Sequence, residues 1–298
     1  MIFAYFFFIF SIISCIILSK EEKMGKIISF ANQKGGVGKT TTCVNVATYM
    51  AMMGKKVLIL DLDPQGNATT AVGINKTPNL KTIYDLIDGA SPYEDVIQET
   101  IIDNLFIIPS TVDLSGAEVE LIQIPQREKV IKRILDEIKD CYDFILIDCP
   151  PSLTLITVNA LTASNSIIIP IQCEFFALEG LTQLMNTVRL IKYHLNPDLD
   201  VEGVVMTMKD KRYNLTNQVS NEILKFFNKK VYLTSIPRNV RLAEAPSHGL
   251  PVALYDSTSK GAEAYLSLAE EIMKRNGTPF KKLSKVRKIK FKEESDNG

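Results

Sequence analysis

Residues 26–42 read KIISFANQKGGVGKTTT, and this stretch decides the fold. An apolar run leads into a loop rich in glycine, and the residues after the loop open a helix. Glycines let such a loop turn tightly, so that its backbone N–H groups point at phosphate oxygens. The positive end of the following helix also attracts anions. The stretch therefore predicts a phosphate-binding loop between a strand and a helix.

Eight consecutive residues make up the predicted phosphate site: Lys34, Gly35, Gly36, Val37, Gly38, Lys39, Thr40 and Thr41. In such a loop Lys39 would reach the β- and γ-phosphates of a nucleotide, and the Thr40 hydroxyl would ligate Mg²⁺. Gln33 stands where the ordinary loop has its first glycine, and Lys34 is a second lysine inside the loop. A lysine supplied by another subunit would neutralise phosphoryl charge only after two subunits meet.

The rest of the chain alternates apolar runs with helical stretches, as expected of a parallel sheet wound by helices. Runs such as FILID at 144–148 are continuously apolar, which is typical of strands buried on both faces. The predicted strands are 26–32, 56–61, 105–109, 144–148, 166–171, 201–206 and 231–235. The predicted helices are 40–53, 127–140, 178–195, 214–228 and 261–275. The fold class predicted is α/β, a mostly parallel sheet with helices on both faces.

Acidic residues follow two of the predicted strands. Asp61 and Asp63 lie in LDLDPQGN at 60–67, and Asp148 lies in FILIDCPP at 144–151. Carboxylates at the carboxyl ends of parallel strands face the ligand crevice. The alternative is that such an aspartate binds no ligand and only caps the helix that follows. Beside the phosphate loop we expect Asp148 to hold the Mg²⁺ shell, through water.

Length and charge limit the classes of protein. The chain has 298 residues, and its 34 basic and 34 acidic side chains give a formal net charge of zero. We assign residues 24–276 to one α/β domain, which this length can fill with an ample core. Balanced charge excludes a wholly polybasic protein, so contact with nucleic acid must come from a local patch. The five cysteines show no CxxC spacing, which predicts reduced, mostly buried thiols in a reducing compartment.

Both ends of the chain differ in composition from the rest. Residues 1–19 carry no charge and are long enough to cross a hydrocarbon core. Residues 1–23 are therefore either a membrane anchor or the product of a start codon assigned too early, with Met24 as the true start. We favour the second, because the segment from Met24 reads as a complete first strand. Residues 277–298 form a basic tail, interpreted as solvated rather than as an amphipathic helix.

Six ordered blocks resemble the ParA/Soj family of partition ATPases, which belongs to the deviant Walker A group that also contains MinD. The blocks are ANQKGGVGKTTT at 31–42, LDLDPQGNAT at 60–69, IDCPPS at 147–152, NALTASNS at 159–166, PIQCEFFALEGL at 170–181 and SIPRNVRLAEAPSHGLP at 235–251. The resemblance implies a P-loop NTPase fold of the deviant Walker A type and ATP hydrolysis to ADP and phosphate.

The resemblance also implies roles for single residues. Lys34 would cross a dimer interface to the partner's nucleotide, and Asp63 would orient the attacking water. Asp61 would support the metal and the switch region. Pro237 and Asn239 would lie beside the adenine, although an ordinary loop shaped by proline would look the same in the sequence.

A basic group is the candidate DNA surface, and it consists of Lys209, Lys211, Arg212, Arg238 and Arg241. The resemblance assigns DNA binding to Arg212 and Arg241. Arginine contacts with phosphates carry affinity but no sequence information, so binding would be non-specific. Two arginines per subunit bind weakly, and a dimer doubles them, which would make DNA binding depend on ATP. Solvated surface charges with no partner are the alternative.

Cofactors and partners follow from the same resemblance. ATP and Mg²⁺ would join two copies into a homodimer, which would bind non-specific DNA. A ParB-like centromere-binding protein would stimulate hydrolysis during partition of a chromosome or a plasmid. The expected location is the cytoplasm, on the nucleoid, and membrane anchoring through residues 1–23 is not favoured.

Two other functions are considered. A MinD-like, membrane-associated ATPase of the cell-division site would use an amphipathic helix at its end, and the basic tail and the apolar N-terminal segment keep this alternative open. A scaffold that uses ATP only to dimerise would need no residue to orient water, and Asp63 argues against it.

Overall fold

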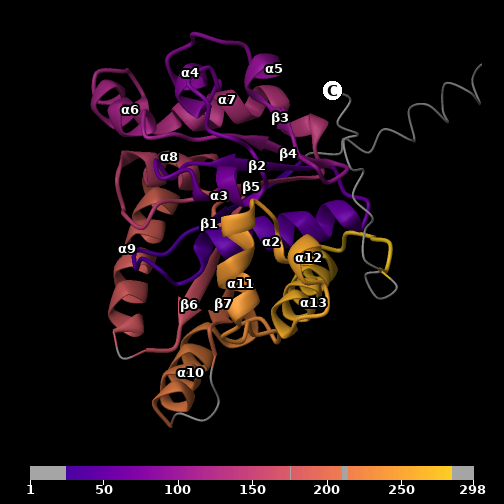
Figure 1. Ribbon diagram of the computed structural model, residues 1–298. Coiled ribbons are helices and arrows are strands. Elements are labelled where there is room, and N and C mark those ends of the chain that lie inside the picture. Colours follow the sequence, from indigo (N-terminus) through magenta and orange to yellow (C-terminus); the bar gives the residue numbers. More distant parts are fainter. Residues whose placement is uncertain (1–24, 175, 210–213, 284–298) are drawn as a thin grey trace, which may run out of the picture.

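The computed structural model describes residues 25–174, 176–209 and 214–283 (Figure 1). Its centre is a sheet with the strand order β3-β4-β2-β5-β1-β6-β7. The strands are β1 (Lys26–Phe30), β2 (Val57–Asp61), β3 (Gln98–Glu99), β4 (Leu105–Ile108), β5 (Phe144–Asp148), β6 (Ser166–Gln172) and β7 (Asp200–Thr207). All neighbouring strands are parallel except the short β3, which pairs antiparallel with β4. The predicted mostly parallel sheet is therefore confirmed.

Helices cover both faces of this sheet (Figure 1). The α-helices are α2 (Lys39–Met52), α3 (Asn67–Ala71), α4 (Ile83–Ile87), α5 (Tyr93–Val96), α6 (Leu114–Leu121), α7 (Val130–Ile138), α8 (Leu155–Ala163), α9 (Ala177–His194), α10 (Asn214–Phe227), α11 (Val240–Glu244), α12 (Val252–Tyr255) and α13 (Lys260–Arg275). Helices α2, α3, α12 and α13 contribute to one buried cluster, and α4 to α10 contribute to the other.

Strand β5 explains why the strands read as continuous apolar runs. Its side chains Phe144 and Leu146 belong to the cluster under α2 and α13, whereas Ile145 and Ile147 belong to the cluster on the opposite face. Successive side chains of a strand point to opposite faces, so a strand covered on both sides must be apolar at every position. The sheet thereby separates two cores.

The predicted strand at 231–235 is wrong. Val231 makes only an isolated bridge to Val204. The N–H groups of Leu233 and Thr234 donate to the Glu271 carboxylate on α13, each at 2.9 Å, and not to a strand. A side chain from a distant helix therefore accepts the two N–H groups that would otherwise donate to a neighbouring strand.

The ends of the chain lie largely outside the described residues, so the division into 1–23, 24–276 and 277–298 stays a prediction. The first part of the basic tail contacts the domain, since Lys281 donates its N–H to the Met53 carbonyl at 3.2 Å. Cys43, Cys149 and Cys173 are buried free thiols, Cys141 is an exposed one, and Cys15 lies outside the described residues. Across the described residues, no helix combines the length and apolarity needed to span a membrane.

Candidate functional site

The glycine-rich loop lies between β1 and α2, at the edge of the sheet where the parallel strands end. Gly36 has φ of 72° and Gly38 has φ of 87°, in the left-handed region that glycine adopts without steric cost. Gly38 also precedes the first residue of α2 as its N-cap and offers no side chain there. The loop and the helix N-terminus thus direct backbone N–H groups to one place, which suits a phosphate group.

Two residues that the sequence analysis did not single out hold this loop. Asn32 donates its side-chain amide to the Pro170 carbonyl of β6 at 2.7 Å and accepts the N–H of Lys34 at 3.0 Å. Thr207 of β7 donates its hydroxyl to the Val37 carbonyl at 2.7 Å. Both are buried polar residues at or just beyond the ends of apolar strands, which is the sequence signal that could have indicated them.

The two lysines of the loop have different surroundings. Lys39 is only 6% exposed, and its ammonium donates to the Lys34 carbonyl at 3.2 Å. Burial lowers the pKa of Lys39, and the Asp148 carboxylate opposes this shift. Lys34 is half-exposed and forms an ion pair with Glu174, which follows β6. Lys39 therefore faces into the site, whereas Lys34 is held by its own subunit's carboxylate.

Asp148 ends β5 and is fully buried, yet neither of its carboxylate oxygens has a hydrogen-bond partner among the described residues. Burial raises the pKa of Asp148 well above its ordinary range, and repulsion from Asp61 adds to the rise. The Thr40 hydroxyl is near enough to oppose this rise, although it does not meet the geometry of a hydrogen bond. A buried carboxylate without a partner is costly, so this position fits a cation.

No group of three or more His, Cys, Asp or Glu side chains is arranged to hold a metal ion in the part of the chain that the structure describes. Magnesium ions in nucleotide sites commonly take one or two protein ligands and complete their shell with phosphate oxygens and water. Asp148 and Thr40 are consistent with a site of that kind.

Asp61 is the last residue of β2, and Asp63 lies in the loop that follows. Asp61 is fully buried, and its two oxygens accept hydrogen bonds from the Asp63 N–H and from the N–H and hydroxyl of Thr69. Burial raises the pKa of Asp61 to about 6, although the hydrogen bonds from Thr69 lower it. Asp63 is 8% exposed, and one oxygen accepts the Gln65 N–H at 2.9 Å. Asp61 thus organises the loop that carries Asp63.

The block that contains Pro237 and Asn239 lies beside the end of β7. Lys209 donates its N–H to the Ile236 carbonyl at 3.0 Å, and Lys209 and Pro237 form a parallel bridge. Asn239 caps α11 by accepting the N–H of Arg241 at 2.9 Å. The structure therefore brings this block next to the strand whose Thr207 holds the phosphate loop.

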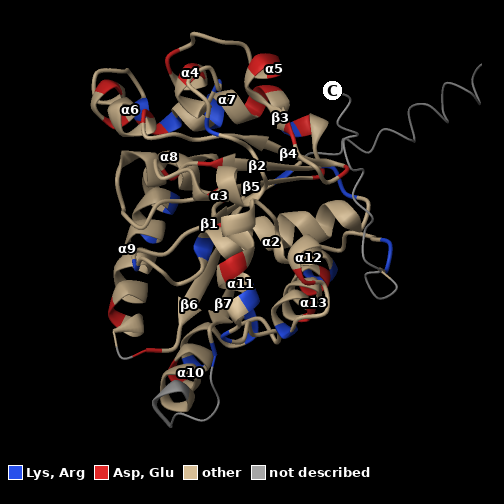
Figure 2. Ribbon diagram, in the orientation of Figure 1, with Lys and Arg blue, Asp and Glu red and all other residues tan. Residues whose placement is uncertain are grey.

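The candidate DNA residues are only partly described, because Lys211 and Arg212 lie outside the described residues. Arg241 is exposed and pairs with Glu244 at 2.8 Å and with Asp256 at 3.3 Å. In Figure 2, α11 and α13 each carry both acidic and basic residues. The positive charge of Arg241 is thus partly neutralised within the subunit.

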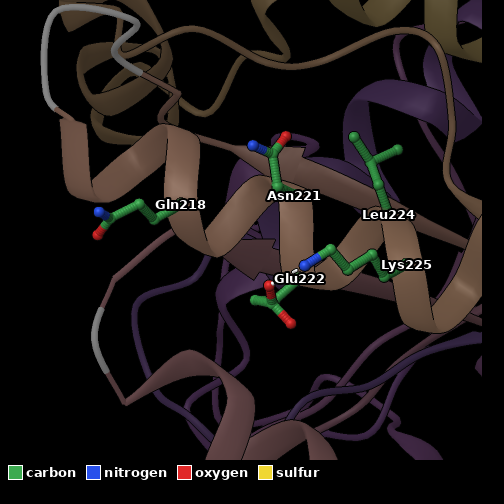
Figure 3. Close-up of a pocket in the computed structure, with 5 residues that line it drawn as sticks. All are labelled: Gln218, Asn221, Glu222, Leu224 and Lys225. Carbon is green, nitrogen blue, oxygen red and sulfur yellow. Dashed lines mark hydrogen bonds and ion pairs between the residues drawn. The ribbon is translucent and has the colours of Figure 1, made fainter.

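Two hollows in the described part of the chain are candidate nucleotide sites. One, of about 390 Å³, is bordered by Thr40 and Thr41 of α2, by α3 and by residues 242–252. The other, of about 670 Å³, is lined by Gln218, Asn221, Glu222, Leu224 and Lys225 (Figure 3). These side chains all come from α10 and point in different directions, and Glu222 pairs with Lys225 at 2.6 Å. Without converging polar groups, the hollow on α10 does not suit a nucleotide.

Comparisons with known proteins agree with this geometry. Residues 25–201 match the family described as "AAA domain". The chain is 57% identical over 249 residues to the sporulation initiation inhibitor protein Soj of Bacillus subtilis, a match that covers 84% of this chain and 98% of that protein. It is 48% identical over 252 residues to the chromosome partitioning protein ParA of Caulobacter vibrioides, covering 84% and 94%.

Two solved structures are similar in fold. Cobyrinic acid a,c-diamide synthase of Mycobacterium smegmatis, with bound ATP analog and magnesium, has a TM-score of 0.73 and 30% identity, covering 87% of this chain and 100% of that chain. The septum site-determining protein MinD of Pyrococcus horikoshii, complexed with Mg-ADP, has a TM-score of 0.71 and 29% identity, covering 85% and 98%.

Proposed function

Because the chain belongs to the Soj/ParA family of chromosome-partitioning ATPases, we propose that ATP and Mg²⁺ join two copies of it into a dimer that binds DNA. The observation that carries the proposal is the buried Asp148 carboxylate without a partner, next to Lys39 and Thr40 at the base of a glycine loop. A carboxylate in that setting needs positive charge, and the magnesium ion that accompanies a nucleotide would supply it.

Hydrolysis then depends on positioning and electrostatics. Backbone N–H groups of residues 34–41 and the Lys39 ammonium would hold the phosphates, while Thr40 and Asp148 would hold the metal, with Asp61 in support. Bound Mg²⁺ would neutralise negative charge on the β- and γ-phosphates. Asp63 orients the attacking water, and no side chain of the protein acts as a nucleophile.

Dimerisation completes the site. Lys34 of each subunit leaves Glu174 and contacts the nucleotide of the other subunit, where it neutralises charge on the transferred phosphoryl group. Pro237 and Asn239 flank the adenine, since their block lies beside the end of β7. Because Lys34 acts on the nucleotide of the other subunit, hydrolysis would require two subunits.

DNA binding uses the combined surface of the dimer. Arg241 and Arg212 contact phosphates without reading sequence. The dimer collects on the nucleoid in the cytoplasm, and a ParB-like protein stimulates hydrolysis and thereby releases the subunits, which drives partition of a chromosome or a plasmid.

Replacement of the water-orienting carboxylate tests the hydrolytic site. Asp63→Ala should still bind ATP and dimerise but should lose at least about tenfold in kcat, because only the orientation of water is affected. Nucleotide affinity is measured by calorimetry, dimerisation by analytical ultracentrifugation and turnover by phosphate release. Turnover at the wild-type rate would remove Asp63 from its proposed role.

Charge reversal tests the DNA surface. With ATP present, the Arg212→Glu, Arg241→Glu variant should bind DNA at least about tenfold more weakly, because several phosphate contacts become repulsive. The Arg189→Glu, Lys192→Glu variant, on the exposed part of α9, makes the same change of charge elsewhere and should bind DNA normally. Unchanged binding by the double variant in a light-scattering assay would exclude this surface.

A MinD-like membrane function is the second candidate, favoured by the structural similarity to the septum site-determining protein. Flotation with anionic liposomes, done with the full chain and with a chain that starts at Met24, separates the two functions. Association of either form with liposomes in an ATP-dependent manner would support the MinD-like function.

A further inference from the structure

We infer that Thr69 is a positioning residue for ATP hydrolysis, whose hydroxyl fixes the Asp61 carboxylate and, through it, the loop that carries Asp63. The inference rests on the proposed function, in which Asp63 orients the attacking water. Thr69 itself is fully buried in α3 and acts through Asp61.

Asp61 sits in an unfavourable electrostatic setting. It ends β2 in register with Asp148, which ends the neighbouring strand β5, and both carboxylates are fully buried. Two buried carboxylates on adjacent strands repel each other, so the orientation of Asp61 depends on its hydrogen-bond donors. Oδ2 of Asp61 accepts the Thr69 hydroxyl at 2.7 Å and the Thr69 N–H at 2.8 Å.

The Thr69 hydroxyl has a fixed direction, because it has a second partner. Its oxygen accepts the N–H of Ser110 at 3.0 Å, so its proton is free to point only at Asp61. Ser110 follows β4, the strand beside β2. One buried hydroxyl therefore ties the end of β2 to the segment after β4.

The loop 63–69 is fastened at both ends by the same carboxylate. At its start, Oδ1 of Asp61 accepts the Asp63 N–H at 3.1 Å. At its end, Oδ2 holds Thr69. Between them Gly66 has φ of 58°, and a Cβ added there would lie 2.3 Å from the Ser110 carbonyl oxygen. The segment between Asp61 and Thr69 is packed too closely against residue 110 to change its own conformation. A rotation of the Asp61 carboxylate must therefore displace Asp63.

Isosteric replacement of the hydroxyl tests the inference in the full-length chain. Thr69→Val keeps the volume but removes the donor to Asp61 and the acceptor for Ser110. We expect kcat to fall about tenfold to a hundredfold, while the dissociation constant for Mg-ADP stays within about twofold. Thr69→Ser restores the hydroxyl and should recover kcat to within about threefold.

The control is Thr162→Val, which makes the same change at a buried threonine of α8 whose hydroxyl donates to its own helix. It should leave kcat unchanged. Thr69→Cys keeps a weaker donor of similar size, so its kcat should lie between the Ser and Val values, and it decides the matter if Thr69→Val does not fold.

Three results would overturn the inference: wild-type kcat in Thr69→Val or, where that variant does not fold, in Thr69→Cys; a parallel loss of kcat and Mg-ADP affinity; and failure of Thr69→Ser to recover turnover. Asp63→Ala separates this inference from the proposed function. If Asp63→Ala loses turnover and Thr69→Val does not, only the role of Thr69 fails, whereas wild-type turnover in Asp63→Ala removes the hydrolytic assignment itself.

Discussion

The two lysines of the phosphate loop have different partners within the subunit. Lys39 is buried and faces the site, whereas Lys34 is half-exposed and paired with Glu174 of the same chain. If Lys34 must serve the nucleotide of a partner, the pair with Glu174 has to break during dimerisation. The contact was not predictable from the sequence, because it requires the end of β6 to lie beside a loop that precedes it by 140 residues.

Loss of the Glu174 carboxylate should therefore favour the dimer. An exposed ion pair contributes about 0.2–1 kcal/mol and each dimer breaks two such pairs, so Glu174→Gln should tighten dimerisation with a non-hydrolysable ATP analogue by about twofold to thirtyfold. Sedimentation equilibrium measures the dissociation constant. Glu179→Gln, on the first turn of α9, makes the same change of charge and should have no effect. A weaker dimer in Glu174→Gln would mean that Glu174 helps the assembled state.

Whole elements show which patterns the sequence reveals. Strands β1, β2, β4, β5, β6 and β7 were predicted within one or two residues, because strands buried on both faces are apolar at every position. The predicted strand at 231–235 failed, since its pattern is that of a strand while the N–H groups of Leu233 and Thr234 are bound by Glu271. Short helices such as α4 and α11 are too brief to show a helical period, so they were missed.

The end of β7 gives a prediction about the phosphate loop. Thr207→Val keeps the side-chain volume and removes the hydroxyl that donates to the Val37 carbonyl. Such a hydrogen bond contributes about 0.5–1.5 kcal/mol, so affinity for Mg-ADP should fall about twofold to tenfold in calorimetry. The control is Thr48→Val in α2, whose buried hydroxyl has no partner among the described residues, and it should bind normally. Equal affinity in the two variants would show that the loop holds its shape without β7.

At the scale of the molecule, a partly buried network joins β1 to the end of α13. Glu202 of β7 accepts hydrogen bonds from Lys26 of β1 at 2.6 Å, from Ser166 of β6 at 2.6 Å and from Asn276, which follows α13, at 2.7 Å. Lys26 also contacts Asn276 directly. The family was inferred correctly from sequence blocks, and the α/β class from the alternation of apolar runs with helical stretches. The network around Glu202 was not predicted, because its members are spread over 250 residues of the sequence.

Stability should depend on pH through Glu202. Burial by itself would raise the pKa of Glu202, but the hydrogen bonds from Lys26, Ser166 and Asn276 outweigh it and lower that pKa. A lowered pKa in the folded state means that the network stabilises the protein above the unfolded pKa of about 4.3 and that this is lost as the pH falls through the folded value.

Glu202→Gln should thus lower the free energy of unfolding by about 1–3 kcal/mol at neutral pH, with the difference from wild type shrinking below about pH 4. Urea unfolding of both proteins at several pH values measures this difference in the free energy of unfolding. Asp200→Asn, on the same strand as Glu202, removes an exposed pair with Lys230. It should lower the free energy of unfolding by less than about 1 kcal/mol. A difference that persists unchanged at acid pH would rule out a charged Glu202 as the cause.

The contact between Lys281 and Met53 has a practical consequence. Helix α2 has 14 residues and is about 21 Å long, and it runs from the phosphate loop to the carbonyl that accepts the Lys281 N–H. Strand β1 likewise starts at Lys26, the end of that strand remote from the loop. A fluorescent label attached at Lys281 would therefore lie about one helix length from the phosphate loop, on the side of the sheet where β1 begins.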